Sequence, residues 1–130
     1  MKILLDTHVW LWAVGGGKLR KRARRALEDP KNELWLSPVS IWEINQLYSK
    51  GKIQVDDTIE RWIEAAMREL PCREAYVTNE IALEARAFAL PEGDMSDRLL
   101  GATARVLDLT LFTADPNLLE CDDIPTARAA

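Results

Sequence analysis

Four short, mainly apolar runs recur along the chain, and each ends at a polar or turn-forming residue. They are Ile3 to Leu5, Leu34 to Leu36, Ala75 to Val77 and Leu109 to Phe112. An apolar run of this length is typical of a strand that is buried on both faces, as strands of parallel sheets are. The pattern therefore predicts a strand at each run, the first of which ends at Asp6.

Between these runs lie segments in which apolar residues recur with the period of an α-helix. The clearest covers residues 57–70 and lines up on one face Ile59, Trp62, Ile63, Ala66, Met67 and Leu70. Asp57 and Glu60 stand near its start at capping-box spacing. A second helix is predicted over residues 37–50, because a serine cap precedes a proline at the first helical position and Gly51 follows the end.

Strands that alternate with helices predict a parallel sheet with helices on both faces. Two further helices fit this order, a basic one over residues 18–27 and another over residues 96–107. The loosest stretches are residues 15–17 and Pro91 to Asp94, and no linker or repeat divides the 130 residues. We therefore expect a single domain over residues 1–130, a three-layer α/β/α fold with a central, mainly parallel sheet.

The net charge of −4 and the pI near 5.1 argue against a polyanionic partner, because phosphate binding normally relies on an excess of lysine and arginine. The distribution of charge partly answers this objection. One stretch concentrates cations, namely Lys18, Arg20, Lys21, Arg22, Arg24 and Arg25. These residues are candidates for contact with phosphates, although a solvated helix face is the simpler interpretation.

Other features bear on the compartment. Cys72 and Cys121 form no CxxC pair, so neither a zinc site nor a disulfide framework is indicated. Asp6 and His8 interrupt the apolar core that a signal peptide would need. No segment reaches the roughly 18 uninterrupted apolar residues of a membrane span. We expect a protein of the reducing cytoplasm without membrane contact.

Asp6 and Asp115 both follow predicted strands. In an open parallel sheet, ligands collect outside the carboxyl ends of the strands, so both carboxylates can face one crevice. Taken singly, each aspartate is more often a turn or cap residue.

Two acids on predicted helices extend this pattern. Glu43 shares a helical face with Val39 and Leu47, and a charge in that apolar stripe needs a partner, either an arginine or a metal ion. Asp97 lies in the first turn of its helix, where an acid can simply complement the helix dipole. Asp94 is near enough to add a metal or water contact, although a loop role is simpler.

Together these acids predict a metal site. Like charges about 4 Å apart repel by about 4 kcal/mol at an effective dielectric of about 20, so a cation should lie among them. Oxygen ligands favour Mg²⁺, with Mn²⁺ as a substitute, over zinc. The expected chemistry is phosphoryl transfer to a metal-activated water, with one ion or two.

The motifs that carry these acids occur in a recognisable order. They are LLDTHVWLW (residues 4–12), SxWE (40–43), DxxDRLLxATA (94–104) and LxTAD (111–115). This set resembles PIN-domain ribonucleases, specifically the VapC-type toxins of VapBC toxin-antitoxin systems, over nearly the whole chain. The resemblance implies a metal-binding catalytic set of Asp6, Glu43, Asp97 and Asp115. It implies supporting roles for Thr7, Ser40, Asp94 and Thr113. The chain departs from the pattern at Met95, where relatives often carry proline.

The resemblance also implies an activity and partners. The chain would be a magnesium-dependent endoribonuclease, the toxin of a type II system, that leaves a 3′-hydroxyl and a 5′-phosphate on RNA. It would form a homodimer and be inhibited by a VapB-like antitoxin, and the basic stretch would then be a candidate for RNA binding. Because tryptophan is a preferred interface anchor, the candidates for antitoxin contact are Trp10, Trp12, Trp42 and Leu47. Core packing is the simpler interpretation of any one tryptophan.

Four other interpretations have less support in the sequence. His8 could act as an acid or ligand, although local packing is simpler. The GGGK run at residues 15–18 lacks the spacing of a phosphate-binding loop. A phosphatase of the haloacid-dehalogenase kind would need a second aspartate where His8 stands. A non-catalytic binding module with a degenerate PIN fold is disfavoured because all the acids are present.

Overall fold

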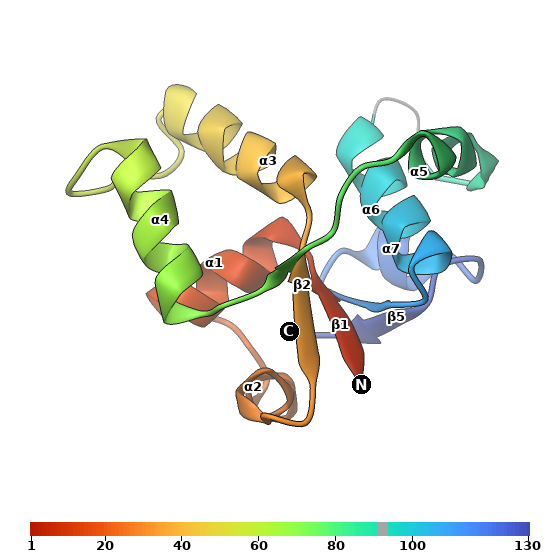
Figure 1. The fold of residues 1–130 in the computed structure, drawn as a ribbon, viewed down its shortest axis with the longest axis horizontal. Helices are drawn as coiled ribbons and strands as arrows, with labels where there is room; N and C mark the ends of the chain where they lie inside the picture. Colours follow the sequence, from red (N-terminus) through yellow and green to blue (C-terminus); the bar gives the residue numbers. More distant parts are fainter. Residues whose placement is uncertain (91–93) are drawn as a thin grey trace.

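The computed structural model describes residues 1–90 and 94–130. Of the loose stretch predicted from Pro91 to Asp94, only Asp94 therefore falls within the described residues. These residues form a five-stranded sheet with the order β3-β2-β1-β4-β5. Its strands are β1 (Lys2–Leu5), β2 (Glu33–Leu36), β3 (Arg73–Glu74), β4 (Thr110–Thr113) and β5 (Thr126–Arg128). Every neighbouring pair is parallel, so the carboxyl ends of the strands share one edge (Figure 1).

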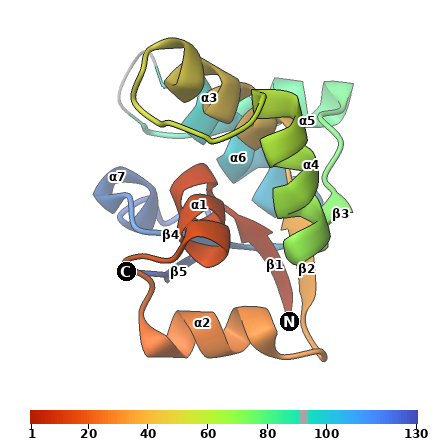
Figure 2. The ribbon, with the colours of Figure 1, turned by 90° about the vertical axis from the view of Figure 1, so that its left-hand side faces the viewer.

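Helices cover both faces of this sheet. They are α1 (Thr7–Gly15), α2 (Lys21–Glu28), α3 (Pro38–Ser49), α4 (Ile59–Glu69), α5 (Asn79–Glu84), α6 (Met95–Val106) and α7 (Pro116–Leu119), with a 3₁₀ turn at Ala85–Ala87. Figures 1 and 2 show α1 and α4 on one side of the sheet and α5 and α6 on the other. The predicted three-layer α/β/α fold is confirmed. In the described ranges, no helix has the length and apolar character that crossing a membrane would require.

The central strand β1 is buried on both faces, as its apolar run predicts. Ile3 and Leu5 pack in one core cluster with Phe112 of β4, whereas Leu4 packs in the other with Leu111. This alternation is the two-residue period of a strand, and it leaves no polar face on β1 beyond Lys2. The end of β1 is therefore fixed in the middle of the molecule.

One predicted strand was wrong in its position. The apolar run Ala75 to Val77 lies beyond β3, which pairs earlier, with Arg73 beside Trp35. The partner strand β2 stops at Leu36 because Ser37 caps the next helix, so nothing remains for residues 76 and 77 to pair with. Tyr76 is accordingly 66% exposed.

Helix α1 was not predicted. Its sequence is apolar nearly all round, so it lacks the polar face that reveals a surface helix. Asp6 does more than end β1, because its side chain caps α1. The short elements α5, α7 and β5 also escaped prediction, since few residues in each carry a periodic signal.

The predicted helices agree with the structure apart from their caps and starts. Ser37 caps α3 as expected. Helix α4 is capped by Thr58 rather than by the box of Asp57 and Glu60, because the Thr58 hydroxyl accepts the Arg61 N–H at 3.3 Å. The predicted basic helix begins later than expected, at Lys21. Helix α6 begins at Met95, with Asp94 as its cap.

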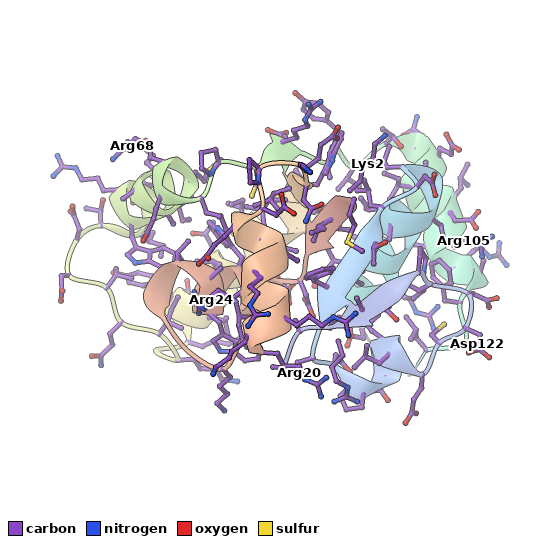
Figure 3. All side chains as sticks on the ribbon, turned by 90° about the horizontal axis from the view of Figure 1, so that it is seen from below. Lys2, Arg20, Arg24, Arg68, Arg105 and Asp122 are labelled. Carbon is purple, nitrogen blue, oxygen red and sulfur yellow. The ribbon has the colours of Figure 1, made fainter. Side chains whose placement is uncertain are left out.

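The basic helix α2 lies away from the helices that carry the predicted acids. In Figures 1 and 2 it lies at the foot of the molecule, whereas α3 and α6 lie in the upper half. Seen from below in Figure 3, α2 crosses the front with Arg24 on it and Arg20 near its start. Its buried side chains, Ala23 and Leu27, belong to the same core cluster as Ile3 and Leu5 of β1, so α2 is fixed to the sheet by its apolar face.

Candidate metal-dependent nuclease site

The predicted acids meet in one pocket. This acid pocket has a volume of about 450 Å³ and is lined by Asp6, His8, Trp12, Glu43, Asp94, Asp97, Ala114, Asp115 and Pro116. It lies beyond the carboxyl ends of β1 and β4, where Asp6 and Asp115 follow their strands. Helices α3 and α6, which pack against each other, bring Glu43 and Asp97 to it. Among the described residues that line it there is no lysine or arginine.

Asp6 is held on both carboxylate oxygens. Its Oδ1 accepts the backbone N–H of Thr7 at 2.8 Å, and its Oδ2 accepts the Thr113 hydroxyl at 2.6 Å. The same Thr113 oxygen accepts the Asp115 N–H at 3.0 Å, so one hydroxyl links two of the acids. Burial raises the pKa of Asp6, although the Thr113 hydrogen bond opposes that shift. Asp6 is thus oriented by neutral groups, with no cation paired to it among the described residues.

Glu43 is hydrogen-bonded to a threonine hydroxyl and not to the arginine that was the alternative. Its Oε1 accepts the Thr7 hydroxyl at 2.6 Å, and the Thr7 and Ser40 hydroxyl oxygens are 3.0 Å apart. Because a hydroxyl carries one proton, Thr7 gives its proton to Glu43 and can accept that of Ser40. No ion pair within the described ranges involves Glu43, and burial raises its pKa. Among the described residues, the charge in this apolar stripe is therefore not paired with a lysine or an arginine.

The closest group of acids is Asp94, Asp97 and Asp115. Each offers one carboxylate oxygen, and the three oxygens lie within 4.8 Å of one another. At that separation, each pair of charges repels by about 3 kcal/mol at an effective dielectric of about 20. Burial, followed by the neighbouring Asp94, raises the pKa of Asp97 to about 9. Without a cation, burial and the crowding of these carboxyl groups therefore favour the protonated form of Asp97.

The arginine beside this cluster is used elsewhere. Arg98 follows Asp97 in α6, but its guanidinium donates to the carbonyl oxygens of Phe88 and Leu90, both at 2.9 Å. Carboxylate oxygens in close approach, without such neutralisation, are the donor set that Mg²⁺ and Mn²⁺ prefer. The residues present therefore fit a divalent cation of this class.

The structure brings together the four predicted acids and adds weight to Asp94. The family resemblance implied a supporting role for Asp94, whereas its carboxylate caps α6 by accepting the Asp97 N–H at 3.2 Å and also belongs to the closest group of acids. Asp115 caps α7 through the Asn117 N–H at 2.8 Å with Oδ1. His8 lines the pocket, is exposed, and packs beside Trp12 with ring centroids 6.0 Å apart.

The residues predicted to contact an antitoxin differ in how far they are exposed. Trp10 is fully buried, where it packs against Trp62, so its prediction as a docking residue was wrong. Trp42 is 61% exposed, and Trp12 and Leu47 are half-buried. None of the basic residues 18–25 lines the acid pocket in the described part of the chain, and their role in RNA binding stays a prediction.

Sequence reasoning missed a pair of lysines beside the acid pocket. Lys50 and Lys52 line a neighbouring groove that shares Glu43 with it. The signal was present in the spacing, because residues 43, 47 and 50 fall on one helical face. The short Lys-Gly-Lys sequence was read only as the end of a helix.

Comparisons with known proteins agree with this geometry. The PIN domain family matches residues 3–124. "Ribonuclease VapC22" of Mycobacterium tuberculosis is 32% identical over 120 residues, which cover 89% of this chain and 88% of that protein. The fold is similar to that in a structure of VapBC2 from Rickettsia felis bound to a promoter DNA fragment, with a TM-score of 0.73, 14% identity and full coverage of both chains. It is also similar to that in VapBC-1 from nontypeable Haemophilus influenzae, with a TM-score of 0.70, 18% identity and 98% coverage of each chain.

The two kinds of comparison carry different weight. The solved structures share too little sequence to show more than the fold, whereas the family match spans nearly the whole chain and includes all the predicted acids. The relative from Mycobacterium tuberculosis adds similarity at the level of sequence over most of both proteins. The chain therefore belongs to the PIN domain family, as a VapC-type member.

Proposed function

We propose that this protein is an endoribonuclease that requires Mg²⁺ or Mn²⁺, and that it is the toxin of a toxin-antitoxin pair. The observation that carries the proposal is the acid pocket, in which Asp6, Glu43, Asp97 and Asp115 converge without a neutralising lysine or arginine in its described lining. The name of the relative from Mycobacterium tuberculosis supports RNA as the substrate. The pocket itself supports phosphodiester hydrolysis, because a cation in it would face the substrate's phosphate.

The residues divide into two groups. Asp94, Asp97 and Asp115 would hold the ion, since their oxygens are the closest to one another. When bound, the ion would offset the negative charge of the phosphate and acidify a water. Asp6 and Glu43, fixed by Thr113 and Thr7, would orient that water and accept its proton, a role that suits carboxyl groups whose pKa is raised.

Hydrolysis then needs one bond to form and one to break. The water oxygen attacks phosphorus, its proton passes to a pocket carboxylate, and the bond from phosphorus to the 3′-oxygen of the preceding nucleotide breaks. The products are a 5′-phosphate and a 3′-hydroxyl, whose oxygen takes up a proton as it leaves.

The proposed partner is an antitoxin that covers this site. The structural relatives named as VapBC complexes support such a partner. Its contacts would involve Trp12, Trp42 and Leu47, which are exposed or half-buried. A homodimer is part of the same proposal, and light scattering of the isolated protein would measure it.

The test is RNA cleavage by purified wild type, Asp6→Asn and a control, Asp56→Asn, which alters an exposed aspartate outside the pocket. We expect Asp56→Asn to cut RNA like wild type in Mg²⁺ or Mn²⁺, and Asp6→Asn to lose at least about 100-fold in rate with an unchanged circular dichroism spectrum. Full activity of Asp6→Asn would refute the assignment. Hydrolysis of small phosphoesters without RNA cleavage would favour the phosphatase alternative, and a wild type that binds no Mg²⁺ would favour a non-catalytic module.

A further inference from the structure

A second groove adjoins the acid pocket and differs from it in charge. The lysine groove is lined by Trp42, Glu43, Gln46, Leu47, Lys50, Lys52 and Ser96. Glu43 lines both cavities, and Ser96 precedes Asp97 in the first turn of α6. The groove is therefore continuous with the acid pocket at Glu43.

The two lysines stand on a turn of fixed geometry. Helix α3 ends at Ser49, and Gly51 has a φ of 71°, the left-handed conformation that glycine adopts most readily. The Gly51 N–H donates to the Tyr48 carbonyl at 3.0 Å, and the Lys52 N–H donates to the Leu47 carbonyl at 2.9 Å. This pair of bonds is a Schellman motif. It holds the backbone of Lys50 and Lys52 on either side of the glycine, at the wall of the groove.

The lysines are free to bind an anion. Neither takes part in an ion pair among the described residues, and both are exposed. The acid pocket has no lysine or arginine in its described lining, and a nucleic acid that enters it must place its flanking phosphates somewhere less negative. The lysine groove is the adjoining cavity that offers positive charge.

The groove also offers an aromatic surface. The Trp42 side chain is 61% exposed although it lies beside buried Ile44 and half-buried Glu43 on α3. An exposed aromatic ring next to cations is the combination with which proteins bind single-stranded nucleic acids, because bases stack on the ring while lysines contact the phosphates. A peptide partner would use Trp42 and Leu47 but would leave the lysine pair and its continuity with the acid pocket without a role.

We propose that the lysine groove binds the single-stranded RNA segment that flanks the cleaved phosphodiester. In it, one base stacks on Trp42 and the adjacent phosphates contact Lys50 and Lys52. This inference rests on the proposed ribonuclease function and extends it, because it names where the substrate lies outside the acid pocket. An antitoxin that competes with RNA would have to cover the same groove.

The test measures binding and cleavage separately. The probe is a mixed-sequence 12-nucleotide RNA with a terminal fluorophore, and fluorescence anisotropy is recorded over a range of salt in Ca²⁺, which takes oxygen ligands as Mg²⁺ does. The variants are Lys50→Ala/Lys52→Ala and Trp42→Ala. The matched control for the lysines is Lys2→Ala/Lys31→Ala, which removes two other exposed lysines, one at the start of β1 and one shortly before β2. The matched control for the tryptophan is Trp42→Phe, which keeps an aromatic ring.

The slope of log affinity against log salt is negative, and we expect the Lys50→Ala/Lys52→Ala variant to reduce its magnitude by about 1.4, because each phosphate contact on a single strand contributes about 0.7. The Lys2→Ala/Lys31→Ala control should leave the slope unchanged. Trp42→Ala should weaken binding about 5- to 150-fold, and Trp42→Phe should retain most of the affinity.

Two outcomes distinguish a failure of this inference from a failure of the proposed ribonuclease function. An unchanged slope and affinity in both groove variants, while wild type binds and cuts RNA in Mg²⁺, would overturn the groove and leave the ribonuclease standing. Groove-dependent binding without any cleavage in Mg²⁺ or Mn²⁺ would support the groove as an RNA site and contradict the proposed activity.

Discussion

The acid pocket and the basic helix α2 show two ways of concentrating charge. The pocket gathers carboxylates from positions as far apart in the sequence as Asp6 and Asp115, because parallel strands end at one edge and α3 and α6 pack beside it. Helix α2 instead displays cations that are neighbours in the sequence, and it lies at the foot of the molecule in Figures 1 and 2. The cations of α2 are easy to recognise in the sequence because they are adjacent, but none of them lines the acid pocket among the described residues.

The difference teaches where to look for RNA contacts. A net charge of −4 would disfavour RNA if it were spread evenly, yet the acids are gathered in a pocket that suits a metal ion. Lys50 and Lys52 line the groove that shares Glu43 with this pocket, whereas none of the basic residues 18–25 lines either cavity in the part of the chain that the structure describes. Proximity to the acids, more than the number of cations, should decide which residues bind the substrate.

The Thr113 hydroxyl, which links Asp6 and Asp115, gives the largest effect expected from any residue other than the pocket acids themselves. Thr113→Val removes the donor to Asp6 and the acceptor for the Asp115 N–H, so we expect metal affinity or activity to fall about 10- to 100-fold. The free energy of unfolding should fall by about 1 to 3 kcal/mol, because buried groups lose their partners. Thr113→Ser, which keeps the hydroxyl, is the control. Wild-type cleavage and metal binding by the valine variant would show that this hydroxyl does not position the acids.

The acid pocket should make the stability of the protein depend on pH, because the pKa values of Asp6, Glu43 and Asp97 are raised. The pKa of Asp97 rises from 3.8 to about 9, so the folded state binds more protons than the unfolded state between these values. Stability of the metal-free protein should then decrease as the pH rises through this window.

Metal binding would oppose this decrease, because a bound ion would take the place of the proton. Millimolar Mg²⁺ should raise Tm by a few degrees at about pH 8.5 and by less at about pH 6. Asp97→Asn should remove most of this pH dependence, whereas Asp56→Asn should retain it. A Tm gain from Mg²⁺ that is equal at both pH values would contradict the titration of this cluster.

The smallest effect is expected from α2. Lys21→Ala/Arg22→Ala removes two exposed cations that line neither cavity, so at physiological salt their charge is largely screened from RNA in the pocket. We expect the dissociation constant for the 12-nucleotide RNA to rise by no more than about twofold. A larger loss than that of Lys50→Ala/Lys52→Ala would reverse the comparison and restore α2 as the main RNA-binding surface.

The sequence predicted the fold where a pattern had a clear period. Helix α4 shows its apolar face, and β1 shows double burial, whereas α1 is apolar nearly all round and gave no helical signal. The run Ala75 to Val77 predicted a strand two residues too late, because the end of β2 at Leu36 depends on the cap of α3. Local composition does not contain that information.

The candidate site was likewise predicted only in part from the sequence. The acids were found through their motifs and through their places after strands and on helices, and they do share a pocket. The close approach of Asp94 and the groove formed by Trp42, Lys50 and Lys52 were not found. Both depend on how α6 packs against α3 and on the direction in which the chain leaves α3 at Gly51, which only the tertiary structure fixes.

The central claim is that the acids of the pocket tolerate one another by holding a divalent cation. Calorimetric titration of Mg²⁺ into the wild-type protein and into Asp97→Asn tests it most directly, since it needs no RNA substrate. We predict saturable binding to wild type and none to Asp97→Asn at millimolar Mg²⁺. Equal binding by the two proteins, or no binding of Mg²⁺ or Mn²⁺ by wild type, would contradict the account.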